Sequence, residues 1–283
     1  MPLGSEMKIP MEHAPGAVLA QGRTAQIRLY GQNRLLKIFK EGMPRAYAEF
    51  EFKAGRFAVK AGLPTPKPEQ LLEWEDRPAI VYERLSGSTM LRRLVQKPWN
   101  LFRDAAHMAR LHVAVHRTGA GPDSGLPCLK EALREKIEAA PILSREEKEG
   151  VLASLEKLPV GRQLLHGDLH PDNIMIDGRK GWIIDWMTAS YGHPAADAAR
   201  TVLMLRTGSL PEESSRAFEL ILTSVRRLLL SRYLRTYLRL SGLERGELEA
   251  WMPVLAAARL AEWLPPDEKL SLAGIVRDSL RPA

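Results

Sequence analysis

The sequence has a single cysteine, Cys128, among its 283 residues, so it cannot form an intramolecular disulfide. A lone thiol fits a reducing compartment, and we expect a cytoplasmic protein. No run of apolar residues approaches the roughly 18 that a membrane-spanning helix requires. No basic segment followed by an apolar one opens the chain either, so we expect neither a membrane anchor nor a secretory leader.

Internal repeats, low-complexity tracts and zinc-finger spacings are also missing. The net charge of +7 is spread along the chain, with one concentration of arginines between Arg226 and Arg239. Leucines and tyrosines are interspersed with these arginines at helical spacing, which favours the solvated face of an amphipathic helix over a nucleic-acid surface. We therefore expect no nucleic-acid partner, and the sequence does not indicate an oligomeric state.

The first third of the chain has the pattern of an antiparallel sheet with one helix. A helix is predicted between Pro44 and Gly62, because apolar residues recur there at helical spacing and glycine ends the run. Short runs rich in isoleucine, leucine and valine, separated by tight turns, predict strands at 17–20, 26–30, 34–40, 70–74 and 79–85.

After Ser86 and Gly87 the pattern becomes mainly helical. Helices are predicted at 99–118, 129–139, 145–158, 195–207, 212–240 and 246–264, with short strands at 163–165, 173–177 and 182–186. The sequence thus predicts an α+β fold with two domains: a small β-lobe at residues 1–85 and a larger helical lobe at 86–283. A cleft between two lobes is a usual place for a ligand.

The strongest chemical signal is the segment His166–Asn173 (HGDLHPDN), followed by Ile183–Trp186 (IIDW). Phosphoryl transfer requires a carboxylate that orients the attacking hydroxyl, oxygen ligands for Mg²⁺ and a cation on the phosphates. Asp168 and Asn173 lie five residues apart, and Asp185 follows twelve residues later at the end of a predicted strand. This spacing is typical of kinase catalytic loops.

These motifs, in this order, resemble those of the aminoglycoside phosphotransferase and choline-kinase-like family. The resemblance extends from about Gly16 to Trp263 and implies a bilobal, protein-kinase-like fold. It also implies a small-molecule kinase that uses Mg²⁺ with ATP or GTP. The sequence departs from kinase patterns at Trp186, where protein kinases carry Phe, and at Asp172, where many relatives have Gly.

The resemblance assigns roles to the residues of the helical lobe. Asp168 corresponds to the catalytic base, and Asn173 and Asp185 to the Mg²⁺ ligands. The expected loop-shaping and bracing residues are His166, His170 and Asp197.

The resemblance also assigns nucleotide-binding residues in the β-lobe. Lys37 corresponds to the strand lysine that holds the α- and β-phosphates, and alternation along its strand suggests that it is buried. Its expected partner is Glu51, with Glu49 as the alternative that the sequence leaves open.

Three further positions complete the expected nucleotide site. Backbone groups at Glu83 and Leu85 correspond to the hinge that reads the base. Gly22 lies in the phosphate-covering loop, which has one glycine instead of the usual glycine array.

Two histidines of the predicted helix 99–118, His112 and His116, share a face at i, i+4, as a zinc site requires. Metalloprotease motifs place a glutamate directly after the first histidine, and here Val113 follows. We interpret both histidines as packing or surface residues.

Three functions are compatible with these motifs. A small-molecule kinase is favoured because Lys37, Asp168, Asn173 and Asp185 are all present, whereas a nucleotide-binding pseudokinase that acts as a scaffold would be expected to lack one of them. A protein kinase is disfavoured by the short interval between Asp185 and Asp197, which leaves little room for an activation segment. The acceptor stays open among an aminoglycoside, an amino alcohol, a sugar or another metabolite, as do the choice of ATP or GTP and any role in antibiotic resistance.

Overall fold

The computed structural model describes residues 15–207 and 216–281. The chain divides into two compact units. The first contains the described residues up to Ser88 together with Met175–Thr188, and the second contains Thr89–Ile174 and the described residues from Ala189 onward. The first four residues of the predicted helix 212–240 lie outside the described residues.

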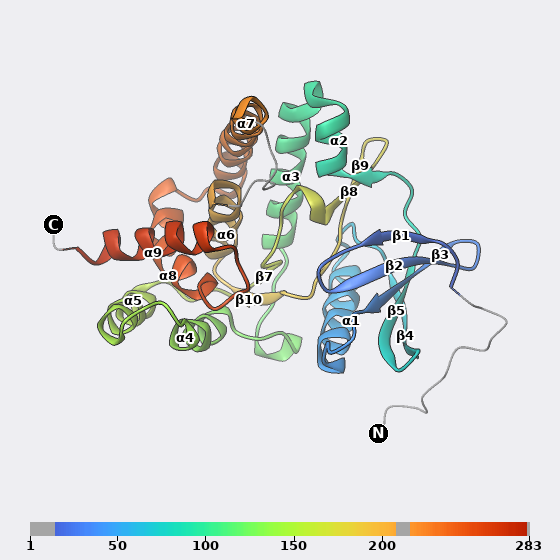
Figure 1. Cartoon of the computed structure of the whole chain (residues 1–283), viewed down its shortest axis with the longest axis horizontal. Coiled ribbons are helices and arrows are strands. Elements are labelled where there is room, and N and C mark those ends of the chain that lie inside the picture. The colour runs from blue at the N-terminus through green and yellow to red at the C-terminus, as the bar shows by residue number, and fades with distance from the viewer. Residues whose placement is uncertain (1–14, 208–215, 282–283) are drawn as a thin grey trace. The chain divides into compact units, whose positions relative to one another are not determined.

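The first unit is built on a five-stranded antiparallel sheet with the strand order β1-β2-β3-β5-β4 (Figure 1). Helix α1 packs against β4 and β5. The elements are β1 (Val18–Gln21), β2 (Ala25–Tyr30), β3 (Arg34–Phe39), α1 (Arg45–Lys60), β4 (Pro68–Trp74) and β5 (Arg77–Glu83).

Strand β3 contributes side chains to two separate apolar clusters, because successive residues of a strand point to opposite faces. Leu36 and Ile38 pack with residues of the neighbouring strands, including Val81. Phe39 lies in the other cluster with Ala48 of α1. Lys37 shares its face with Phe39 and is therefore placed on the side of the sheet that the helix covers.

The segment 175–188 belongs to the first unit although it follows most of the second in sequence. Strand β8 (Ile174–Asp177) neighbours β9 (Lys180–Ile183) in a small sheet. After β9, the Ile183 N–H donates to the Pro64 carbonyl at 2.7 Å and the Trp186 indole donates to the Thr65 hydroxyl at 2.9 Å. These contacts fix the segment that carries Asp185.

One glycine of the first unit is required by this packing. Gly87 has a φ of +98°, and a Cβ added there would lie 2.1 Å from the carbonyl oxygen of Ile176. Any side chain would therefore clash with the β8 backbone, and an L-residue would also be strained at that φ.

The second unit is mainly helical. Helix α3 packs along α7, and α8 contacts four other helices: α4, α5, α6 and α9. The helices are α2 (Met90–Gln96), α3 (Leu101–His116), α4 (Leu129–Ala139), α5 (Arg145–Lys157), α6 (Pro194–Thr207), α7 (Arg216–Ser241), α8 (Arg245–Arg259) and α9 (Pro266–Leu280). Short elements are β6 (Ser88–Thr89), β7 (Gln163–Leu165), β10 (Ser190–Gly192) and the 3-10 turns at 98–100, 122–124 and 171–173.

The β7–β10 pair positions the segment that follows β7. The two strands are antiparallel, with Leu165 opposite Ser190. The His166 N–H, directly after β7, donates to Asp197 in the first turn of α6. None of the described helices is both long and apolar enough to cross a membrane.

The predicted order of elements is confirmed: antiparallel strands with one helix, followed by a mainly helical part. Two helices had not been predicted, α2 and α9. The predicted helix 246–264 ends at Arg259, and a separate helix begins at Pro266.

Candidate active site

In the first unit, the Lys37 ammonium lies between two carboxylates. Its Nζ donates to Glu51 Oε1 at 2.7 Å and Oε2 at 2.8 Å, and to Asp185 Oδ1 at 3.3 Å. Lys37 is 8% exposed and Glu51 1%. The structure therefore brings together three residues that the sequence predicted at widely separated positions.

The structure decides between the two glutamates that the sequence left open. Glu51 faces inward and pairs with Lys37, whereas the exposed Glu49 accepts from Arg45 Nε at 3.1 Å. Both lie on α1, and only Glu51 is on the face of the helix that packs against the sheet.

Tyr82 is a further member of this cluster that the sequence did not reveal. Its hydroxyl donates to Glu51 Oε1 at 2.9 Å. Burial and the Glu51 charge hold the pKa of Tyr82 well above its usual value, so the phenol stays a donor. Burial acts to lower the pKa of Lys37, but the charges of Glu51 and Asp185 outweigh it, and the pKa is raised. Lys37 is therefore a permanent cation.

Asp185 combines an unusual backbone with a partly exposed carboxylate. Its φ of +68° lies in the left-handed region, which non-glycine residues seldom adopt. Such strained residues concentrate at functional sites, where surrounding contacts hold them in place. The side chain is 32% exposed, so the carboxylate is accessible to a ligand as well as to Lys37.

The remaining predicted residues of the first unit lie on loops or at a strand end. Gly22 follows β1, and its N–H donates to the Ala25 carbonyl at 2.8 Å. Glu83 ends β5, with its N–H bonded to the Lys67 carbonyl at 3.2 Å. Leu85, two residues further on, is half-buried and makes no backbone hydrogen bond within the described part of the chain.

In the second unit, the loop after β7 brings Asp168 and Asn173 into contact. Asn173 Nδ2 donates to the Asp168 carbonyl at 2.9 Å and to its Oδ2 at 3.2 Å. The Asn173 amide oxygen forms no hydrogen bond with any described residue. His170 Nε2 lies 3.4 Å from Asp168 Oδ2, and its Nδ1 accepts from the Asp172 N–H at 3.2 Å. His170 thus shapes the loop and contacts the carboxylate.

The Asp168 carboxylate is ionised at neutral pH. Burial acts to raise the pKa of Asp168, but the contact with His170 and the positive charge of Arg200 outweigh it, and the pKa is lowered. Arg200 had not been predicted as a site residue. Its Nε donates to the carbonyl of Gly167, the residue immediately before Asp168.

Asp197, in the first turn of α6, holds the backbone of this loop. Its Oδ2 accepts from the His166 N–H at 2.7 Å and its Oδ1 from the Gly167 N–H at 2.9 Å. His166 in turn accepts from the Asp168 N–H through Nδ1 at 3.2 Å. The φ of Gly167 is +79°, a conformation that presents its N–H to Asp197 without steric cost.

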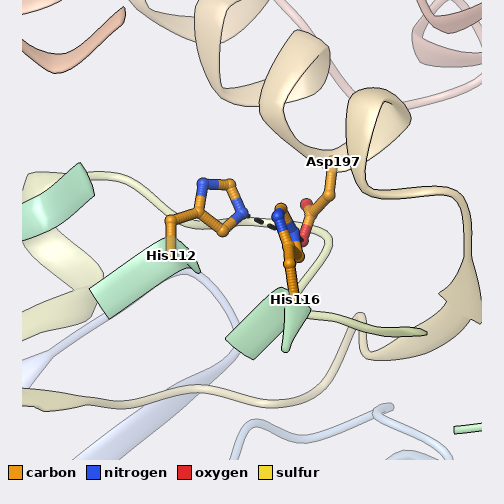
Figure 2. Close-up of side chains that lie close together, drawn as sticks. All are labelled: His112, His116 and Asp197. Carbon is orange, nitrogen blue, oxygen red and sulfur yellow. Dashed lines mark hydrogen bonds and ion pairs between the residues drawn. The ribbon is translucent and has the colours of Figure 1, made fainter. Parts of the chain in front are cut away.

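Two buried histidines of α3 contact the same Asp197 carboxylate, as Figure 2 shows. Each Nε2 lies 3.1 Å from Asp197 Oδ2. On their other ring nitrogens, His112 Nδ1 lies 2.7 Å from the Tyr233 hydroxyl and His116 Nδ1 lies 2.7 Å from the Tyr237 hydroxyl. Two histidines of α3 thus contact the aspartate that holds the loop, and two tyrosines of α7 contact the histidines.

The protonation state of His116 follows from its surroundings. Burial and the neighbouring His112 lower its pKa to about 4, so the ring is neutral at neutral pH. A carboxylate can only accept hydrogen bonds, so the single ring proton lies on Nε2 and Nδ1 accepts from Tyr237. Burial also raises the pKa of Tyr237, which keeps the phenol a donor.

The ligand atoms of His112, His116 and Asp197 lie within 4.8 Å of one another, a spacing compatible with a metal ion. The same atoms already take part in hydrogen bonds, so the network is satisfied without an ion. The i, i+4 spacing of the two histidines was the signal that could have revealed this brace. Their partners, 81 to 121 residues away in sequence, could not be inferred from it.

Comparisons with known proteins bear on the fold and the family of this chain. Among solved structures, a thermostable variant of aminoglycoside phosphotransferase APH(4)-Ia in complex with ADP and hygromycin B has a TM-score of 0.65. The identity is 15%, over 95% of this chain and 96% of that chain. Amicoumacin kinase hAmiN in complex with AMP-PNP, Ca²⁺ and Ami has a TM-score of 0.58 and 17% identity, over 93% of this chain and 86% of that chain.

A choline/ethanolamine kinase family protein from Mesorhizobium loti is also similar. Its TM-score is 0.57 and its identity 19%, over 95% of this chain and 89% of that chain. These similarities show that the chain has the α+β, protein-kinase-like fold of such enzymes. No curated protein was found to match the chain in sequence.

A family model shows which protein family the chain belongs to. The model APH, described as the phosphotransferase enzyme family, matches residues 18–251. The chain therefore belongs to this phosphotransferase family, and the predicted family and enzyme class are confirmed.

Proposed function

We propose that this protein is a small-molecule kinase that transfers the γ-phosphate of ATP or GTP, with Mg²⁺, to a hydroxyl group. The observation that carries the proposal is the buried Lys37 ammonium, held by Glu51 and next to the partly exposed Asp185. A permanent cation fixed beside an accessible carboxylate is suited to holding polyphosphate and its metal ion together. A cytoplasmic location remains part of this proposal.

Lys37 would bind the α- and β-phosphates. Glu51 would fix the lysine in place, since both carboxylate oxygens lie within 2.8 Å of Nζ. The backbone N–H and C=O of Leu85, with the carbonyl of Glu83, would hydrogen-bond the base. The loop at Gly22 would cover the phosphates. Backbone readout of this kind leaves the choice between ATP and GTP open.

The chemistry of the donor set fits Mg²⁺, which prefers oxygen ligands. Asp185 offers a carboxylate, and Asn173 offers its amide oxygen because its amide nitrogen is used by Asp168. When bound, the ion would neutralise charge on the phosphates. Asn173 and Asp185 are therefore the proposed metal-binding residues.

Asp168 would orient the acceptor and accept its proton. The acceptor oxygen attacks the γ-phosphorus, the bond between that phosphorus and the leaving nucleoside diphosphate breaks, and the hydroxyl proton passes to an Asp168 carboxylate oxygen. The lowered pKa of Asp168 supports this role because it keeps the carboxylate unprotonated. Asp197, His166 and His170 would act by positioning the loop.

The test is phosphate transfer from labelled ATP and GTP to a panel of hydroxylated compounds, with Asp168→Asn beside the wild type. We expect the variant to lose turnover at least about 1000-fold, by analogy with the loss of a catalytic proton acceptor. Nucleotide binding, measured by calorimetry with Mg²⁺, should stay within about twofold. Asp172→Asn is the matched control, because Asp172 lies in the same loop but is exposed.

Undiminished transfer by Asp168→Asn would refute the assignment of the catalytic base. A protein that binds Mg²⁺-nucleotide but shows neither transfer nor Asp168-dependent ATP hydrolysis would instead be the nucleotide-binding scaffold. Aminoglycosides belong in the panel because related structures contain them, but their use by this chain rests on that assay.

A further inference from the structure

A group of five charged side chains lies next to the Asp168 loop in the second unit. We refer to it as the arginine cluster. Its members come from four helices and one connection: Lys136 of α4, Arg200 of α6, Arg259 of α8, Glu262 after α8 and Glu268 of α9.

Arg200 connects this cluster to the loop. Its Nε donates to the carbonyl of Gly167, next to Asp168, and its Nη2 pairs with Glu262 Oε1 at 2.9 Å. Glu262 also accepts from Lys136 Nζ at 3.4 Å. Arg200 therefore links the rest of the cluster to the residue that would contact the acceptor hydroxyl.

Arg259 is the unusual member. It is 5% exposed, and its Nη2 pairs with Glu268 Oε1 at 2.6 Å. Its Nε and Nη1 are buried without a hydrogen-bond partner among the described residues. The carboxylate oxygen of Glu262 lies 3.9 Å from Nε, too far for a hydrogen bond. Buried donors are nearly always paired, so two unpaired donors on one guanidinium point to a missing partner.

The positive charge of Arg259 favours an anionic partner for its two unpaired donors. The cluster holds three cations and two carboxylates, both carboxylates already form ion pairs, and the Asp168 carboxylate beside it is a third negative charge. Burial, and after it the charge of Arg200, lowers the pKa of Arg259 and of Lys136. The side chain of Lys136 is 44% exposed and that of Glu262 24%, so the cluster reaches solvent on this side.

We infer that the arginine cluster binds an anionic group of the acceptor, a carboxylate or a phosphate ester, whose hydroxyl is then phosphorylated. This inference rests on the proposed function and narrows its substrate class. A guanidinium with two free donors matches an oxyanion in charge and geometry. A polycationic acceptor would instead require free carboxylates, and Glu262 and Glu268 are both neutralised by arginines.

The first test compares acceptors in matched pairs that differ in the anionic group. Glycerate is compared with glycerol, gluconate with glucose, and glucose 6-phosphate with glucose, with kanamycin and choline as cationic acceptors. We expect the anionic member of at least one pair to be phosphorylated at least tenfold more efficiently, in kcat/KM, than its neutral counterpart. The pairs with glycerate and gluconate test a carboxylate, and the pair with glucose 6-phosphate tests a phosphate ester.

The second test changes the cluster without leaving a buried charge unpaired. The double variant Arg259→Gln, Glu268→Gln replaces the buried ion pair by two amides. We expect the KM for the anionic acceptor to rise about 10- to 100-fold, as for the loss of one or two charge-assisted hydrogen bonds. The matched control is Arg134→Gln, Glu156→Gln, which removes an ion pair on the surface of the same unit.

A third test measures anion binding directly, without phosphate transfer. Protein saturated with AMP-PNP and Mg²⁺ is titrated with sulfate by calorimetry. Binding should weaken at least tenfold in the Arg259 double variant and stay unchanged in the control. Equal sulfate affinity in all three proteins would overturn the inference, and so would preferred transfer to neutral or cationic acceptors.

These outcomes are separable from failure of the proposed function. If AMP-PNP does not bind, or Asp168→Asn leaves ATP hydrolysis unchanged, the kinase assignment itself fails. If both behave as expected and sulfate binding does not depend on Arg259, only the anionic acceptor is refuted.

Discussion

The buried His116 predicts how the stability of this protein depends on pH. Its folded-state pKa is lowered to about 4 from the ordinary value of 6.5. Below pH 6.5 the unfolded chain takes up a proton on His116, but the folded chain does not until the pH approaches 4. The stability contributed by this group is therefore complete above pH 6.5 and is lost as the pH falls from 6.5 to 4.

The magnitude follows from the two pKa values. One proton is linked to unfolding over about 2.5 pH units, at about 1.4 kcal/mol per unit, which gives about 3 kcal/mol. The pKa of Asp197 is lowered from an ordinary value of 3.8, so its own contribution is lost only at still lower pH. The two contributions therefore occupy separate pH ranges.

The assay is urea unfolding between pH 7 and pH 4 for the wild type and His116→Gln. Glutamine keeps an N–H that can donate to Asp197 but does not titrate. We expect the wild type to lose about 3 kcal/mol more than the variant over this range, a difference of about 1–2 M in urea midpoint. His107→Gln is the comparison, because His107 is only half-buried and lies outside the Asp197 network. Burial also lowers the pKa of His107, so this variant should reduce the pH-dependent loss by less than His116→Gln does.

One result would refute the reasoning. If His116→Gln shows the same loss of stability between pH 6.5 and 4 as the wild type, the ring is not neutral and buried as described. A midpoint that falls equally at all pH values would mean that the variant loses packing alone, without the proton linkage.

Two substitutions test the first unit. Lys37→Met leaves Glu51 as an uncompensated buried charge and should lower the free energy of unfolding by about 3–5 kcal/mol in urea. Adding Glu51→Gln should restore part of this free energy. A loss below about 1 kcal/mol in Lys37→Met would show that the pair is not buried. Gly87→Ala places a Cβ 2.1 Å from the Ile176 carbonyl oxygen and should cost at least about 2 kcal/mol, whereas Gly246→Ala, at an open position, should not destabilise. Equal stability of the two alanine variants would contradict the packing at Gly87.

The sequence predicted those features that depend on local pattern. Alternation along β3 placed Lys37 with Leu35 and Phe39, and the structure has Lys37 buried on the face with Phe39. The predicted helix Leu129–Ala139 has the bounds observed for α4. The short loop from Asp168 to Asn173 is recognisable because its residues lie close together along the chain.

Features that depend on distant contacts were not predicted. The segment 175–188 was assigned to the helical lobe by its place in the sequence, but its packing is decided by Trp186 and Thr65, which are 121 residues apart. Helix α9 was missed although Pro266 at its start, with Asp267 and Glu268 in the first turn, is a recognisable signal. The unpaired donors of Arg259 depend on which charges four separate helices bring together, and no local pattern encodes that.

The proposed catalytic residues fall into two sets, each held by contacts inside its own unit. Lys37 and Asp185 depend on Glu51 in the first unit, whereas Asp168 depends on Asp197 in the second, because Asp197 fixes the backbone N–H groups that precede it. We therefore expect a substitution at Lys37 or Asp185 to weaken nucleotide binding, and a substitution at Asp168 or Asp197 to slow transfer with nucleotide binding retained. Comparing the loss of nucleotide affinity with the loss of transfer rate in a variant identifies which set of residues the substitution disturbs. This holds even where the substituted residue contacts no ligand.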